Sequence, residues 1–182
     1  MLVLKNKKIV PKFKEAIMIA LEHFPELKDI HIRFIEKKRF HFTVASLIRR
    51  WSLFGPRKKR CYTIVINTEV PPEYDHGLFS KLPLKLQIGM LGHELAHVVD
   101  YQQRNIFQII KIVFFYFIPS RKQRFERSID TLAIKHDMGK YLHGFYTHFT
   151  SKHPHKTKKF MESYLDDDQI RLLTKELTGK DI

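Results

Sequence analysis

Cysteine is nearly absent from this chain of 182 residues, which contains only Cys61. A single cysteine cannot build an intramolecular disulfide framework, and it cannot supply a four-cysteine zinc site. Chains without disulfides are typical of reducing compartments, so we expect a cytoplasmic protein.

Long apolar runs are also missing. The most apolar stretch, residues 106–118, is shorter than the about 20 residues of a membrane-spanning helix, and Gln108 and Lys111 interrupt it. We therefore expect no transmembrane span, and we interpret the stretch as a buried helix or strand rather than a surface that faces a membrane or substrate. The first residues contain no apolar segment long enough for a signal peptide, so none is expected.

Acidic residues are few relative to basic ones. The sequence has 33 Lys and Arg against 19 Asp and Glu, which gives a formal net charge of +14. This imbalance suggests an anionic partner: nucleic acid, an acidic membrane surface to which the protein would be peripheral, or an acidic substrate. Basic clusters at 57–60 and 156–159 are candidates for such contacts. A basic protein with no anionic partner is the other interpretation.

The first half of the chain predicts one helix followed by strands. Residues 12–24 place apolar side chains at helical spacing before Pro25. Residues 29–37 alternate, residues 39–48 can form a second strand, and residues 61–70 are rich in β-branched side chains.

The second half predicts helices. Leucine, isoleucine and valine recur at spacings of three and four after Pro83. A further helix is expected from about residue 121 to 140, and another within 161–177. The chain length fits one domain, 1–182, with core motifs at 61–142 and a basic and acidic helical segment at 150–182. This order of elements predicts an α+β fold.

Two histidines and a glutamate stand together in the strongest helical pattern, in the run His93-Glu94-Leu95-Ala96-His97. Residues four apart share a helix face, so both imidazoles can reach one zinc ion. Glu94 is rotated by about 100° from His93 around the helix axis. It would stand beside the metal and act as general base toward the attacking water.

A third ligand is expected downstream, because a catalytic zinc takes three protein ligands and keeps one position open. Glu126 can supply it, and Asp130 lies one turn later on the same face. Asp130 can accept a hydrogen bond from a ligating histidine and fix its ring orientation. The alternative is an exposed helix in which Glu126 only neutralises Arg124 or Arg127.

The two motifs together, H-E-x-x-H and then E-x-x-x-D, resemble those of the gluzincin metallopeptidases. The run 126–142 is most similar to the branch of CaaX prenyl and heat-shock zinc peptidases, and the lack of membrane spans favours its small soluble relatives, the minigluzincins. The resemblance covers residues 61–142. It departs from the family at Ile129, where a small residue is usual, and in the apolar insert 106–118.

This resemblance implies a zincin-like fold, with a small mixed sheet packed on the H-E-x-x-H helix and on a second, glutamate-bearing helix. It implies Zn²⁺ held by His93, His97 and Glu126, with Glu94 as base. Asp130 would hydrogen-bond to one of the ligating histidines. It also implies that the strand before the motif helix, at 63–68, forms the sheet edge to which a substrate peptide adds. Candidate donors to the oxyanion of the transition state are Tyr141, His143, Tyr146 and His148.

The sequence thus favours a zinc metalloendopeptidase acting on peptide or protein substrates. As in small soluble gluzincins, the C-terminal segment 156–182 could hold it latent. The alternative is a basic, zinc-stabilised module without enzymatic activity that binds nucleic acid or an anionic membrane surface.

Overall fold

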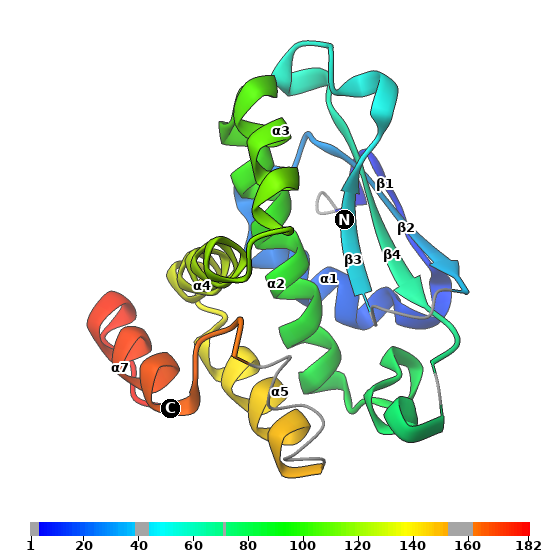
Figure 1. Ribbon diagram of the computed structural model, residues 1–182. Coiled ribbons are helices and arrows are strands. Elements are labelled where there is room, and N and C mark those ends of the chain that lie inside the picture. Colours follow the sequence, from blue (N-terminus) through cyan, green and yellow to red (C-terminus); the bar gives the residue numbers. More distant parts are fainter. Residues whose placement is uncertain (1–3, 39–43, 71, 153–161) are drawn as a thin grey trace.

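The computed structural model describes residues 4–38, 44–70, 72–152 and 162–182. Within these ranges the fold is mixed α+β, with six α-helices and one four-stranded sheet (Figure 1). The strands are β1 (Lys7–Lys8), β2 (His31–Lys37), β3 (Val44–Ile48) and β4 (Cys61–Asn67). The helices are α1 (Lys14–Glu22), α2 (Leu84–Gln103), α3 (Ile106–Phe115), α4 (Pro119–Lys135), α5 (Gly139–Lys152) and α7 (Asp167–Thr178).

The sheet has the order β1-β2-β4-β3. Strand β2 is parallel to β1 and β4, and β3 runs antiparallel to β4. The expectation that residues 63–68 form an edge is therefore wrong, because β4 is paired on both sides. Strand β3 is the edge beside α2 (Figure 1). Part of the strand predicted at 39–48 lies outside the described residues.

One face of the sheet carries the apolar core. On β2 the side chains of Ile32 and Phe34 are buried while His31 is exposed, the alternation expected of a half-covered strand. Tyr62 and Ile64 on β4 continue this layer. Helices α1 and α2 cover it (Figure 1), so the sheet fixes the position of the helix that carries both histidines.

The helix predicted over residues 121–140 is present but ends five residues earlier, and a second helix follows it. Helix α4 ends at Lys135, Asp137 adopts a left-handed conformation with φ of 62°, and α5 begins at Gly139. Gly139 is thus the first residue of a separate helix. A Cβ at this position would lie 2.7 Å from Thr174 Cγ2, so the glycine lets α7 approach.

The glycines of α2 create space for α5. A Cβ on Gly89 would lie 2.8 Å from the Tyr141 carbonyl carbon and closer still to its oxygen. A Cβ on Gly92 would overlap the Met138 side chain. We conclude that these glycines allow close helix packing behind the motif.

The apolar stretch 106–118 is a helix, α3, with a short extension, and its interpretation as a buried element is wrong. Only Ile109 and Ile112 are buried, whereas Phe107 and Phe117 are 79% and 78% exposed. No described helix is both long and apolar enough to cross a membrane.

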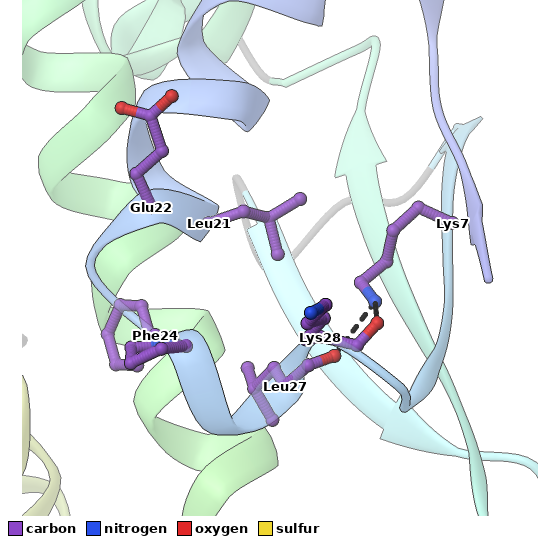
Figure 2. A pocket seen from close by; sticks show the side chains of 7 residues that line it. Lys7, Leu21, Glu22, Phe24, Leu27 and Lys28 are labelled. Carbon is purple, nitrogen blue, oxygen red and sulfur yellow. Dashed lines mark hydrogen bonds between the residues drawn. The ribbon is translucent and has the colours of Figure 1, made fainter. Parts of the chain in front are cut away.

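A small surface pocket lies between α1 and the start of the sheet (Figure 2). The ammonium group of Lys7 reaches across it and donates to the carbonyl oxygens of Leu27 at 2.8 Å and Ile30 at 2.8 Å. Burial lowers the pKa of Lys7 to about 8, although nearby Asp29 opposes the shift. The contacts tie β1 to the turn before β2, so we assign Lys7 a structural role.

The close approach at Gly89 predicts a specific cost. Gly89→Ala should destabilise the protein by about 1–3 kcal/mol, because the added methyl group meets the rigid backbone of α5. The free energy of unfolding, measured by urea denaturation, tests this. Gly144→Ala is the matched control: its Cβ would meet only Leu86 at 3.5 Å, so it should be neutral or stabilise by about 0.5–1 kcal/mol. Equal effects in both variants would contradict the packing argument.

Candidate metal centre

Three ionisable side chains meet where α4 crosses α2. His93 and His97 lie one turn apart on α2, and Glu126 comes from α4. All three are buried, with exposed fractions of 8%, 5% and 3%. Their ligand atoms lie within 4.8 Å of one another, so this group could hold a metal ion. The alternative of an exposed helix with Glu126 paired to arginine does not describe this structure.

The ligand atoms converge on one point. The Nε2 atoms of His93 and His97 are 3.1 Å apart, and each lies 3.3 Å from Glu126 Oε2. Two imidazoles and one carboxylate are a donor set that suits zinc and other divalent transition metals.

Asp130 sits directly behind His93 and has no exposed surface. Its Oδ1 lies 2.9 Å from His93 Nδ1 and accepts a hydrogen bond of 2.6 Å from the Tyr146 hydroxyl. Its Oδ2 accepts from the backbone N–H of Leu165 at 3.0 Å. Because the carboxylate accepts from Nδ1–H, the Nε2 lone pair of neutral His93 points toward Glu126, as a metal ligand requires.

A cation placed among these nitrogen and oxygen atoms would be stabilised by them. Without a metal, a proton on His93 supplies such a charge. Burial lowers the pKa of His93, but its contacts with Asp130 and Glu126 outweigh burial and raise the pKa well above its usual range. Burial likewise opposes ionisation of Glu126, but contacts with His93 and His97 hold its pKa below its usual range. The site is therefore built around positive charge.

The two oxygens of Glu126 have different environments. Oε1 accepts a hydrogen bond of 2.7 Å from the hydroxyl of Tyr116, just beyond α3. Oε2 faces the two imidazoles and makes no hydrogen bond of regular geometry within the described part of the chain. A buried oxygen left without a donor is a position where a bound cation fits.

His97 is held by ring packing, while its Nε2 lies 3.1 Å from His93 Nε2. Its ring stacks on Tyr101 at a centroid distance of 5.7 Å and lies 5.5 Å from the Phe125 ring. Its Nδ1 is buried and has no hydrogen-bond partner among the residues that the structure describes. The tautomer of His97 is therefore less strictly fixed than that of His93.

Glu94 is buried next to the cluster, with 9% of its surface exposed. Its negative charge adds to burial in raising the pKa of both Tyr101 and Tyr116. Helix geometry places it about 100° from His93 and about 60° from His97 around the axis, on the same side of both, so it stands beside the ligands.

The four candidate oxyanion donors do not assemble at the cluster. Tyr146 is committed to Asp130, behind the ligands. His143 pairs with Asp167 at 2.7 Å, and Tyr141 packs edge-on against His23. His148 contacts the ring of Phe149. None of these four is assigned to the transition state.

Other tyrosines line the cluster instead and were not predicted. The ring of Tyr164 lies 5.5 Å from that of His93, and Tyr116 binds Glu126. Only Tyr101 had a sequence signal, because it follows His97 by four residues on the same helix face. Tyr164 and Leu165 bring the segment before α7 against the site.

Metal content tests the cluster directly. After loading with zinc and desalting, the wild-type protein should retain about one ion per chain, measured by native mass spectrometry. Loss of a residue that only hydrogen-bonds to a metal ligand lowers metal affinity by about 10–100-fold. Glu126→Ala removes a ligand itself, so its affinity for zinc should fall by at least that factor. Glu22→Ala, a change on the exposed face of α1, is the control and should retain the ion. Equal retention in the two variants would remove Glu126 from the ligand set.

Metal binding should also release protons. A metal ion binds neutral imidazole, and the raised pKa keeps metal-free His93 protonated at pH 7. We expect release of about one proton per ion, and an affinity that falls as the pH is lowered. Calorimetric titration in buffers of different ionisation enthalpy measures this number. Asp130→Asn should release fewer protons because it removes a contact that raises the pKa. Proton-free binding in the wild type would contradict the charge assignment.

Comparisons with known proteins give no match: no protein-family model, no curated protein and no solved structure matches this chain.

Proposed function

We propose that this protein is a zinc-dependent metallopeptidase of the gluzincin type, with a zincin-like fold. The observation that carries the proposal is the buried convergence of His93, His97 and Glu126, with Asp130 hydrogen-bonded behind His93. The spacing of these residues is that of the two gluzincin motifs, and the fold brings both motifs together.

Zinc fits the donor set. Three protein ligands leave one of the four positions of a tetrahedral ion open, as in catalytic zinc sites. When bound there, zinc would polarise the scissile carbonyl and make a water molecule acidic enough to attack it. His93, His97 and Glu126 hold the ion, and Asp130 sets the orientation of His93.

Glu94 performs the proton transfers in this proposal. Its carboxylate takes a proton from the attacking water and later delivers it to the leaving amine, so it returns to its starting state. Its low exposure and its position beside the ligands suit a base that works close to the metal.

Strand β3 is the proposed site of substrate binding. It is the antiparallel edge strand beside α2, and β4 has no free edge. An extended peptide can add to such an edge through backbone hydrogen bonds.

The side chain of Ile129, where gluzincins usually have a small residue, is 1% exposed and lies within the core, which accommodates its size.

The alternative, a zinc-stabilised module without turnover, predicts the same metal content and no hydrolysis. Its support is the net charge of +14. A change at Glu94 separates the two functions, because this residue has a role in hydrolysis only.

Glu94→Gln should retain zinc and lower peptide hydrolysis by about 10²–10⁴-fold, since the amide cannot accept the proton. Cleavage of a mixed peptide library by zinc-loaded protein, followed by mass spectrometry, measures the effect. Glu22→Gln serves as the matched control and should leave activity unchanged. If Glu94→Gln cleaves as fast as wild type, the role of Glu94 is wrong; if zinc-loaded wild type cleaves nothing, the module without turnover is favoured.

A further inference from the structure

Helix α3 presents an apolar face to the solvent. Phe107, Ile110 and Phe114 recur at helical spacing and are 79%, 44% and 60% exposed. The opposite side of the helix is the one that packs on the protein, through Ile109 and Ile112. A contiguous apolar surface of this kind is unfavourable in water and usually marks an interaction site.

This surface extends beyond the helix. We define the α3 face as the exposed apolar residues Phe107, Ile110, Val113, Phe114, Phe117 and Ile118. Trp51 and Phe54, in the segment before β4, are also 81% and 73% exposed. That segment ends at Arg60, whose guanidinium donates to the carbonyl oxygens of Tyr101 and Arg104 at the end of α2. Both apolar groups therefore lie at the same end of the molecule (Figure 1).

Positive charge surrounds the α3 face. Arg49, Arg121 and Arg124 are exposed cations in the adjoining stretches, whereas Arg60 is buried and Arg104 pairs with Asp100. Lys111 is exposed, one helical turn after Phe107 on the same side of α3, and its ammonium group lies 5.9 Å from the Phe115 ring centre. Arg57, Lys58 and Lys59 are exposed beside the aromatic residues of the preceding segment.

We infer that the α3 face docks onto the surface of a bilayer that contains anionic lipids. Apolar side chains enter the boundary between headgroups and acyl chains, and the surrounding cations contact the headgroups. At ten residues, α3 has a length of about 15 Å, which suits a helix lying in the plane of the surface. Nucleic acid would be attracted by the charge but would leave the aliphatic side chains without a partner. Docking does not depend on the proposed peptidase activity.

Binding to vesicles tests the inference. We expect the wild-type protein to co-sediment with vesicles of phosphatidylcholine containing 30% phosphatidylserine, and at least tenfold less with pure phosphatidylcholine. Trp51 is the only tryptophan and is exposed, so its emission should shift to shorter wavelength on binding.

Paired variants separate the α3 face from general charge. Phe107→Ser with Phe114→Ser keeps every charge and should lower vesicle affinity at least tenfold. Leu172→Ser, which removes a 67% exposed apolar side chain from α7, should bind as the wild type does. Far-ultraviolet circular dichroism and metal content, measured on the same samples, establish that the double variant is folded.

Three outcomes would overturn the inference. One is equal vesicle binding by the folded double variant and the wild type, because charge alone would then explain it. Another is absence of wild-type binding to vesicles at low salt. The third is a dimer in analytical ultracentrifugation that the double variant loses while vesicle binding is unchanged, which would assign the face to a second copy of this chain.

Discussion

A carboxylate with no exposed surface must be surrounded by donors, and at Asp130 the donors come from three places in the chain. His93 lies on α2, Tyr146 on α5, and the Leu165 N–H belongs to the segment before α7. An unpaired buried charge is costly, so these segments have to meet for the fold to be stable. Placement of His93 is a consequence of that requirement, and the cluster with His97 and Glu126 follows from it.

The spacing of residues along each helix was enough to predict part of the cluster. Residues four apart on a helix share a face, so the grouping of His93 with His97, and of Glu126 with Asp130, needed only the identification of two helices. That the two helices lie against each other could not be predicted from spacing. It was implied only by the resemblance to a family, and it is seen in the structure. Contacts from Tyr116 and Leu165 have no local signal, because they depend on how distant segments pack.

The incorrect predictions of the fold have both tertiary and local causes. Residues 64–66, Ile-Val-Ile, form a continuous apolar run typical of a strand buried on both faces, yet strand order cannot be read from one strand. The turn at Asp137 interrupts a pattern that reads as continuous helix, because a left-handed residue is a local backbone choice. Residues 106–118 are apolar enough for a core, and only packing determines that much of this surface has no cover.

Tyr116, directly after α3, connects this helix to the ligand cluster. Its ring belongs to the outer surface, 40% exposed, while its hydroxyl binds the carboxylate that faces both histidines. A single rigid side chain therefore connects the exterior of the protein to the ligand cluster. A force that moved α3 would change the position or the basicity of Glu126 without any rearrangement of α2. Whatever contacts α3 from outside can therefore alter the properties of Glu126 through the phenol group of Tyr116.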